Sequence, residues 1–226
     1  MKIWHISDTH TFENSLGIPE GIDMVIFSGD CSNPRDLLIN EREVRNFISW
    51  FKSLPIKYKI FIAGNHDLSI EKRRVTPENF TNNGITYLEN NSTTIEGLKI
   101  WGSPITPNFG EGWAFNKDRA KMDALWSNIP EYTDIVVTHG PAMGVLDLSL
   151  DRNGNLEMCG CRSLLRHIRR VNPKLFCFGH IHSAKGIDNA GYTVLSGSHT
   201  IYSNGSLVMD GKFDYGAVYN GNVFEI

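Results

Sequence analysis

The sequence predicts an α/β type of fold, in which two β-sheets pack against each other and helices flank them, in a single domain of residues 1–226. Three observations support this prediction. Short apolar runs recur along the chain and end abruptly in polar clusters. Segments of helical periodicity lie between these runs, and the C-terminal quarter alternates short apolar runs with Gly, Ser and Asn. The chain contains no repeat, low-complexity tract or change of composition that would mark a linker.

Five apolar runs are expected to form the central strands. Their β-branched and aromatic residues follow one another almost without interruption, which is typical of strands that are buried on both faces. In such sheets, ligands gather at the carboxyl ends of the strands. The runs are Ile3 to Ser7, Met24 to Ser28, Ile60 to Ala63, Ile135 to Val137 and Leu175 to Phe178.

Three segments are expected to form helices. Two of them place apolar residues at the i, i+3, i+4, i+7 spacing of one buried helix face, and the second of these ends before Pro173, which cannot continue a helix. A third helix is expected from about Lys117 to Asn128. The apolar faces consist of Val44, Phe47, Ile48 and Phe51 in the first segment and Cys161, Leu164, Leu165 and Ile168 in the second. Further along the chain, Tyr192 to Leu195 and Leu207 to Met209 are expected to be antiparallel strands.

The composition is that of an ordinary globular protein, with 41% apolar and 21% charged residues. A net charge of -3 provides no general field that would attract nucleic acid or an anionic membrane, so polymeric nucleic acid is not an expected partner. The apolar run at the N-terminus is broken by His5 and closed by Asp8, which makes it too short for a secretory signal. No later segment is apolar enough to cross a bilayer. We therefore expect a cytoplasmic protein without a membrane partner.

Four cysteines are too few and too scattered for a disulfide scaffold in a chain of this length, and reduced thiols are expected. Cys159-Gly160-Cys161 also invites a structural zinc site, but no second pair of thiols follows at matching spacing. The apolar face of the second helix explains Cys161 without a metal.

Polar clusters follow all five expected strands. Taken singly, Asp8-x-His10 or Gly29-Asp30 is also compatible with a turn, Asn65 tolerates unusual backbone angles, and a lone histidine is more often a hydrogen-bonded core residue than a ligand. Their joint occurrence at strand ends favours a shared metal site. The candidate ligands are Asp8, His10, Asp30, Asn65, His139, His180 and His182.

The donor set indicates two divalent ions. Seven candidate ligands exceed what one tetrahedral ion takes, and the mixture of oxygen and nitrogen donors suits Mn, Fe, Zn or Co, of which Mn is favoured. Alternate positions place Asp8 with His10, and His180 with His182, on common sides of the chain. A carboxylate bridges two cations readily, so Asp30 is the expected shared ligand.

The series Asp8-Thr9-His10, Gly29-Asp30, Gly64-Asn65-His66-Asp67, Thr138-His139 and Gly179-His180-Ile181-His182 resembles the calcineurin-like metallophosphoesterase superfamily over nearly the whole chain. The motifs Trp101-Gly102-Ser103-Pro104 and Trp113-Ala114-Phe115-Asn116 are similar to those of small metallophosphoesterase-domain proteins, which are cyclic nucleotide phosphodiesterase-like. The resemblance implies a four-layer αββα fold with two mixed sheets packed as a sandwich.

The resemblance also implies roles for individual residues. Asp8, His10 and His182 would hold one ion, and Asn65, His139 and His180 the other, with Asp30 between them. His66 would sit near the leaving group, and Asp67 would tune it. The chain departs from many relatives after Asp30, where Cys31-Ser32-Asn33 replaces a second acidic residue.

The expected reaction is hydrolysis of a phosphate ester. Two ions roughly 3.5 to 4 Å apart would lower the pKa of a shared water and hold it as a hydroxide in line with the phosphorus. His66 would protonate the leaving oxygen.

The expected substrate is a small phosphate ester, and a nucleotide or cyclic nucleotide diester is favoured. The aromatic segment from Thr106 to Phe115 is suited to stacking a base, although its rings could instead only pack the loop onto the core. Alternatives are a phosphomonoesterase of broad specificity and a non-catalytic protein-binding scaffold. The expected substrate contacts are Asn33, Asn108, Phe109 and Trp113.

Overall fold

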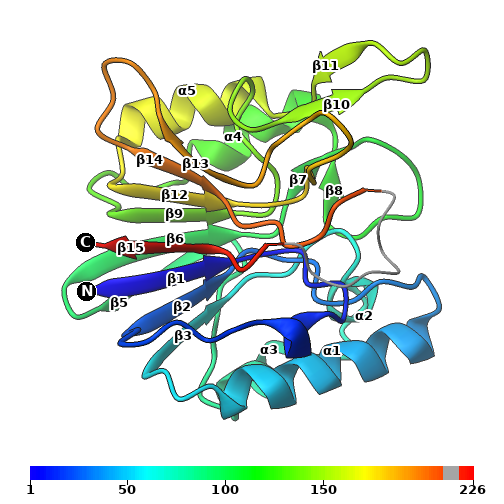
Figure 1. Ribbon diagram of the computed structural model, residues 1–226, viewed down its shortest axis with the longest axis vertical. Helices are drawn as coiled ribbons and strands as arrows, with labels where there is room; N and C mark the ends of the chain where they lie inside the picture. Colours follow the sequence, from blue (N-terminus) through cyan, green and yellow to red (C-terminus); the bar gives the residue numbers. More distant parts are fainter. Residues whose placement is uncertain (211–218) are drawn as a thin grey trace.

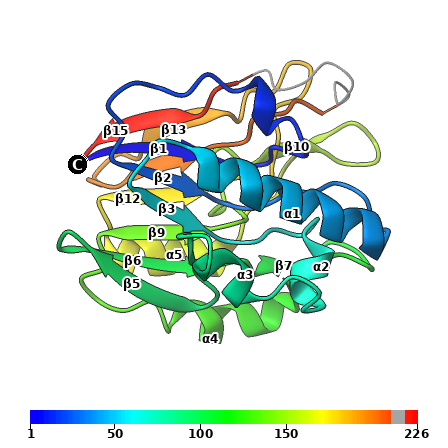
Figure 2. The same ribbon diagram turned by 90° about the horizontal axis from the view of Figure 1, so that it is seen from below.

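The computed structural model describes residues 1–210 and 219–226 (Figure 1). Two large sheets lie face to face, and helices cover the outer face of each one. In Figure 1, α1 (Leu37–Ser53) lies below the lower sheet, and α4 (Met122–Trp126) and α5 (Arg162–Val171) lie above the upper sheet. Figure 2, seen from below, shows α1 in front of the lower sheet. The expected four-layer arrangement of two mixed sheets with flanking helices is therefore confirmed.

The first sheet has five strands in the order β15-β1-β2-β3-β4. The pairs from β1 to β4 are parallel, whereas β15 runs antiparallel to β1. The carboxyl ends of β1, β2 and β3 consequently lie at one edge of the sheet. The strands are β1 (Lys2–Ile6), β2 (Met24–Phe27), β3 (Tyr58–Phe61), β4 (Thr86–Tyr87) and β15 (Asn222–Glu225).

The second sheet has six strands in the order β13-β14-β12-β9-β6-β5. Its four central strands are parallel, and both edge strands are antiparallel to their neighbours. The strands are β5 (Asn91–Ile95), β6 (Leu98–Ser103), β9 (Ile135–Thr138), β12 (Leu175–Phe178), β13 (Gly191–Val194) and β14 (Ile201–Asn204).

The remaining elements are helices and two short strand pairs. None of the helices within residues 1–210 and 219–226 has the length and apolar character needed to cross a membrane. The helices are α1 (Leu37–Ser53), α2 (Leu68–Glu71), α3 (Pro77–Thr81), α4 (Met122–Trp126) and α5 (Arg162–Val171), with 3-10 turns η1 (Glu13–Ser15) and η2 (Arg119–Lys121). The strand pairs are β7 (Thr106–Pro107) with β8 (Asn116–Lys117), and β10 (Leu148–Leu150) with β11 (Leu156–Met158).

Side-chain alternation along the strands builds three apolar cores. In β2, Val25 and Phe27 belong to the core between the first sheet and α1, whereas Met24 and Ile26 belong to the core between the two sheets. A third core joins the second sheet to α4 and α5. Because β2 is buried on both faces, its sequence is almost continuously apolar, as expected for a central parallel strand.

The helix expected from about Lys117 to Asn128 is shorter than expected. Asp118 caps its first turn, the 3-10 turn η2, by accepting from the Ala120 amide, and α4 continues directly from Met122 to Trp126. The expectation of a strand in the C-terminal quarter at Leu207 to Met209 is wrong. Within the described residues this segment takes part in one isolated bridge, from Met209 to Ser183, and a second bridge joins the preceding Ser206 to Ser7, while the neighbouring strand β14 ends at Asn204.

Candidate metal centre

The two sheets bring the five polar clusters together because the carboxyl ends of their parallel strands meet at one edge. Backbone hydrogen bonds join the clusters within each sheet. The Asp8 amide donates to the Gly29 carbonyl at 2.9 Å, and the Gly179 amide donates to the His139 carbonyl at 2.8 Å. Across the sheets, the His180 amide donates to the Asp8 carboxylate at 3.0 Å. All seven candidate ligands are thereby assembled at one site.

A first group consists of Asp8, His10 and His182, whose potential ligand atoms all lie within 4.8 Å of one another. His182 Nε2 is 3.2 Å from Asp8 Oδ1 and 3.4 Å from His10 Nε2. Nitrogen atoms of two imidazoles thus face each other beside a carboxylate, which is an arrangement that suits a cation.

A second group consists of Asp30, His139 and His180, with the same limit of 4.8 Å on the separation of their ligand atoms. His139 Nε2 lies 3.2 Å from Asp30 Oδ2 and 2.9 Å from Asn65 Oδ1. Asp30 also forms a compact group with His10 and His66. It therefore borders both groups, in the position that the sequence predicted for a shared ligand.

Hydrogen bonds at Nδ1 fix the orientation of three of the imidazoles. His10 Nδ1 lies 3.1 Å from the Ser32 carbonyl, and His139 Nδ1 lies 2.9 Å from the Ser28 carbonyl. His182 Nδ1 lies 2.8 Å from Asp210 Oδ1. Each of these rings consequently presents Nε2 to the site, as metal-ligating histidines do when their other nitrogen is hydrogen-bonded. No sequence motif pointed to Asp210.

Two histidines are protonated on both ring nitrogens, and therefore positively charged, in the metal-free protein at pH 7. Burial disfavours the charge on His139, but the adjacent Asp30 outweighs it and raises the His139 pKa to about 9. Burial likewise opposes the charge on His182, yet hydrogen bonds to Asp210 and Asp8 raise its pKa to about 10. Two imidazolium-carboxylate pairs thus occupy the positions where cations and carboxylates would pair in the loaded site.

His10 and His180 are neutral in the metal-free protein. Burial lowers the pKa of His10 to about 4 and that of His180 to about 3. The carboxyl groups of Asp8 and Asp30 remain ionised. Burial raises their pKa values, but the nearby histidines lower them by more, His182 in the case of Asp8 and His139 in the case of Asp30. Neutral imidazoles beside ionised carboxylates are the protonation states that a divalent metal takes as ligands.

The backbone at the site is strained. Four candidate ligands adopt positive φ, a region that L-residues rarely occupy. Such conformations cost of order 1–3 kcal/mol each and cluster at functional sites. These residues and angles are Asp8 (52°), His10 (42°), Asp30 (60°) and His180 (70°).

His66 and Asp67 follow the ligand Asn65, but they face different partners. His66 Nδ1 lies 2.8 Å from the Asn33 carbonyl, and its ring contacts that of His10 at 4.7 Å between centroids. Asp67 is fully buried and accepts hydrogen bonds from the amides of Gly64 at 2.8 Å and Asp30 at 3.1 Å. The Asp67 carboxylate thus holds strand-end loops and the Asn33 carbonyl orients His66, and the tuning of His66 by Asp67 stays a prediction.

The expected substrate contacts separate into two kinds. Phe109 is 46% exposed and its ring lies 4.9 Å from that of His180. The Trp113 ring lies 4.6 Å from that of His66, and the Arg35 guanidinium stacks over it at 4.1 Å, so Trp113 is already engaged. Asn108 Oδ1 accepts from the Gly110 amide within its own loop.

Asn33 is exposed beside His66, and its amide donates to Glu43. Phe109 and Asn33 thus remain the better-placed candidates for contact with a substrate.

Metal ions fit the residues present. Both groups offer imidazole and carboxylate donors without a thiol, which suits the borderline and harder divalent ions expected from the sequence. The backbone at Gly29 and Gly64 lies so close to the candidate ligands that a side chain would not fit at either position. A Cβ on Gly29 would lie 2.5 Å from His139 Nδ1, and one on Gly64 would collide with the Asp30 carboxylate.

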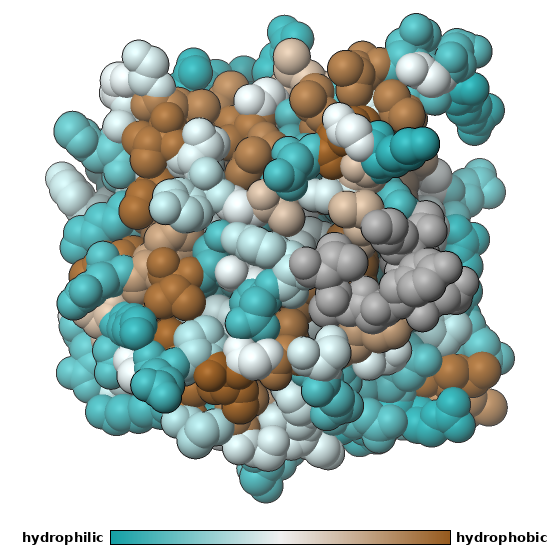
Figure 3. Space-filling view, in the orientation of Figure 1, coloured by the Kyte–Doolittle hydropathy of each residue, from teal (hydrophilic) through white to brown (hydrophobic). Residues whose placement is uncertain are grey.

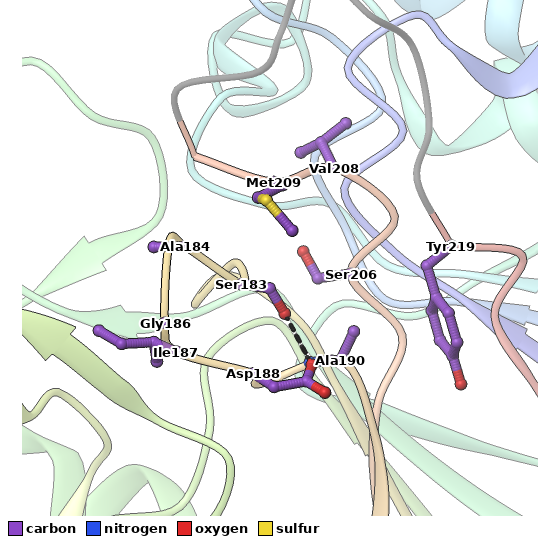
Figure 4. Close-up of a pocket in the computed structure, with 10 residues that line it drawn as sticks. All are labelled: Ser183, Ala184, Gly186, Ile187, Asp188, Ala190, Ser206, Val208, Met209 and Tyr219. Carbon is purple, nitrogen blue, oxygen red and sulfur yellow. Dashed lines mark hydrogen bonds between the residues drawn. The ribbon is translucent and has the colours of Figure 1, made fainter.

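Two pockets lie near the site. One, of about 440 Å³, includes His180 in its wall together with Phe109. The other, of about 390 Å³, is drawn in Figure 4, where Ser183 donates to Asp188 at 3.2 Å. None of the seven candidate ligands lines this second pocket. The first pocket is therefore the one that opens onto the metal groups.

Comparisons with known proteins agree with this geometry. A family model described as calcineurin-like phosphoesterase matches residues 1–184. Metallophosphoesterase domain-containing protein 1 of Homo sapiens is 35% identical over 226 residues, which cover 89% of this chain and 64% of that protein. A UPF0046 protein of Caenorhabditis elegans, C25E10.12, is 35% identical over 206 residues, which cover 83% of this chain and 71% of that protein. The chain thus spans less than two thirds of the length of the human relative.

Solved structures show the same architecture. Phosphopantetheinyl hydrolase from Mycobacterium tuberculosis aligns with a TM-score of 0.57 and 15% identity, covering 92% of this chain and 89% of that chain. The protein TT1561 of Thermus thermophilus aligns with a TM-score of 0.54 and 13% identity, covering 90% of this chain and 88% of that chain. At these identities the likeness concerns the fold alone.

Proposed function

Because the chain belongs to the calcineurin-like phosphoesterase family, we propose that it is a dinuclear metal-dependent phosphodiesterase that acts on a nucleotide or cyclic nucleotide. The family membership confirms the resemblance found in the motifs and assigns the chain to the metal-dependent phosphoesterases. The choice of a diester, of a nucleotide and of Mn as the favoured metal is our proposal.

The observation that carries the proposal is the pair of ligand groups with Asp30 between them. Asp8, His10 and His182 would hold one ion, and Asn65, His139 and His180 would hold the other. When bound, two such ions supply an activated water and neutralise the oxygens of the phosphate. The protein itself determines where the ions, and hence the phosphate, would lie. Ser28, Ser32 and Asp210 fix the orientations of the His139, His10 and His182 rings that would hold the ions.

His66 is the proposed general acid. Its Nδ1 is engaged by the Asn33 carbonyl, which leaves Nε2 for the leaving oxygen of the substrate. The ring is held between His10 and Trp113, at 4.7 and 4.6 Å. A positioned proton donor of this kind contributes roughly 10²- to 10⁴-fold to the rate.

The proposed preference for a nucleotide rests on the aromatic wall of the site. Phe109 stands exposed beside His180 and offers a ring face to a base. Base-aromatic stacking contributes roughly 1–3 kcal/mol per base. Trp113 contributes less to stacking, since Arg35 covers its ring.

A direct test compares diesters with monoesters. The Mn-loaded protein should hydrolyse bis-nitrophenyl phosphate and 2′,3′-cyclic AMP with a higher kcat/KM than nitrophenyl phosphate. A reversed order would favour the broad phosphomonoesterase. A purified protein that contains no metal and stays inert after addition of Mn would favour the non-catalytic scaffold.

A further inference from the structure

The pocket of about 440 Å³ lies on one side of the proposed metal site. Its floor includes His180 and Gly140, which belong to the second ligand group or adjoin it, and Asp210, which bonds His182. Neither His66 nor Trp113 lines it. Since His66 is the proposed donor to the leaving group, the pocket lies away from the leaving-group side. Its volume falls within the roughly 300–1,000 Å³ that is usual for small-molecule sites.

The outer wall of this pocket is the hairpin formed by β10 and β11, and the two faces of the hairpin differ in chemistry. Ser149 and Glu157 are paired in register and both line the pocket. Leu150 and Leu156 form the next pair, so they point to the opposite face, where they are 50% and 62% exposed. Figure 3 shows apolar side chains gathered at the top of the molecule, where the hairpin lies in the same orientation. Met158, which pairs with Leu148, also lines the pocket, so the hairpin contributes Ser149, Glu157 and Met158 to the wall.

The hairpin is fixed at its base. The Asp147 carboxylate is buried and accepts from the amides of Gly144 and Gly160, both at 2.9 Å. Asn189 accepts from the Leu148 amide at 3.1 Å and donates to the Leu148 carbonyl at 2.8 Å.

Asn189 also donates to the His182 carbonyl at 2.8 Å, which ties the hairpin to a candidate metal ligand. The tip is closed by Asp151, which accepts from the amides of Asn153 and Asn155, both at 2.8 Å. The pocket wall is therefore built at a set distance from the metal groups and needs little ordering when a ligand binds.

The charges around the pocket point to a neutral occupant. The lining residues include one cation, Arg119, and two carboxylates, Glu157 and Asp210, so a second phosphate would gain no net attraction. The remaining walls are largely apolar and include Phe109, Pro141 and Met158. A flat, uncharged group with polar edges matches this combination of walls.

We propose that this pocket binds the retained substituent of a phosphodiester, and that this substituent is a nucleoside. The inference rests on the proposed function, because it takes the phosphate to lie on the two metal groups and the leaving oxygen to face His66. A phosphomonoester substrate has only a leaving group, so its hydrolysis would not use the pocket. A nucleoside monophosphate, in contrast, binds there as the product of diester hydrolysis. In the reaction, the oxygen of water bonds to phosphorus, the bond to the leaving oxygen breaks, and the nucleoside stays attached to the phosphate.

The test uses the Mn-loaded full chain and two diesters that share a nitrophenolate leaving group: thymidine 5′-(4-nitrophenyl) phosphate and methyl 4-nitrophenyl phosphate. Ser149→Trp fills the pocket from the hairpin, and Leu150→Trp places the same side chain on the opposite face as a matched control. The ratio of kcat/KM for the thymidine ester to that for the methyl ester should fall about tenfold or more in Ser149→Trp. The ratio should stay at the wild-type value in Leu150→Trp. Thermal melts establish that both variants are folded.

Binding of thymidine 5′-phosphate, measured by calorimetry in parallel, separates failure of the pocket from failure of the proposed function. If the wild type turns over neither diester but Ser149→Trp still weakens nucleotide binding, the diesterase assignment falls and the pocket assignment stands. An unchanged ratio together with unchanged binding in Ser149→Trp overturns the pocket. Equal losses in both tryptophan variants would overturn it as well.

Discussion

His66 is the residue whose role depends most on its surroundings. It borders the first ligand group, yet its Nδ1 is held by the Asn33 carbonyl. His66→Ala should keep both metal ions and lose about 100-fold or more in kcat on alkyl diesters, with a much smaller loss on nitrophenyl esters, which depart without a proton. Metal content by elemental analysis and kcat on the two ester types check this.

The exposed His199 provides a control, because His199→Ala removes an imidazole that belongs to neither ligand group. It should leave both metal content and kcat unchanged. Equal losses of activity on alkyl and nitrophenyl esters in His66→Ala would remove His66 from the role of acid.

Protons and metal ions compete for two histidines. At pH 7, His139 and His182 are protonated in the metal-free protein, since their pKa values are about 9 and about 10. A metal ion takes the neutral imidazole, so at pH 7 loading should release about two protons from these rings, in addition to any proton lost by the shared water. The apparent affinity should rise with pH up to about 9 to 10. Calorimetric titration with Mn in buffers of different ionisation enthalpy measures this release.

A substitution of Asp210 tests the proton release of one ring, that of His182. Its hydrogen bond is the largest of the effects that raise the His182 pKa. Asp210→Asn should therefore reduce the number of protons released at pH 7. Loading that releases no protons in the wild type would show that the imidazolium pairs are absent.

At the scale of elements, Asp67 holds the loops that follow β2 and β3. One carboxylate oxygen accepts from the amides of Gly64 and Asp30, and the other from the amide and hydroxyl of Ser32. In Asp67→Asn the new NH₂ group would face donors, so the free energy of unfolding should fall by about 1–3 kcal/mol. Urea unfolding of the metal-free protein measures this change.

Asp36→Asn is a matched control for that substitution. Asp36 is exposed and caps α1 by accepting from the amides of Leu38 and Ile39, which Asn can do equally well. Its unfolding free energy should stay within about 0.5 kcal/mol of the wild type. A similar small effect in Asp67→Asn would contradict the linking role of Asp67.

The central strands and their polar ends were predictable because both follow from local chemistry. β2 must be apolar on both faces, and the residues after it must be those that a sheet edge can use for binding. Asp8 and His10 follow β1 of the first sheet and His182 follows β12 of the second, so their approach needs parallel strands in both sheets and the packing of one sheet on the other. The candidate ligands were therefore predictable from the strand ends, whereas their assignment to two ions came from the family resemblance.

The supporting contacts were not predictable, because they depend on how distant segments pack. Asp210 is 28 residues from His182, and Arg35 is far in sequence from the Trp113 ring that it covers. The hairpin of β10 and β11 carries only short strands, and its polar face is defined by register rather than by composition. The segment after Lys117 is helical, as its pattern predicted, but the 3-10 form of its first turn, η2, was not predictable from that pattern.

At the scale of the whole molecule, His5 joins the two sheets. It lies in β1, and its ring nitrogens contact Ser203 of β14 at 2.7 Å and Ser28 after β2 at 2.9 Å. Burial lowers its pKa to about 3, so the folded protein holds it neutral while the unfolded chain protonates it below about pH 6.5. Stability from this residue is therefore present above pH 6.5 and is lost as the pH falls towards 3.

The variant His5→Gln tests this pH dependence, because glutamine offers two hydrogen-bonding groups but does not titrate. Between about pH 6.5 and 5, the wild type should lose roughly 1.5 kcal/mol of unfolding free energy through His5, and the variant should lack that part of the decline. Urea unfolding at the two pH values gives the difference. Parallel declines in both proteins would show that His5 titrates alike in the folded and unfolded states.

The central claim is that two sheets bring side chains from five strand ends together to hold a pair of cations. Anomalous diffraction from crystals grown with Mn tests it most directly. Two peaks are expected, one among Asp8, His10 and His182 and one among Asn65, His139 and His180, with Asp30 between them. A single peak, or peaks that lie away from these two groups, would contradict it.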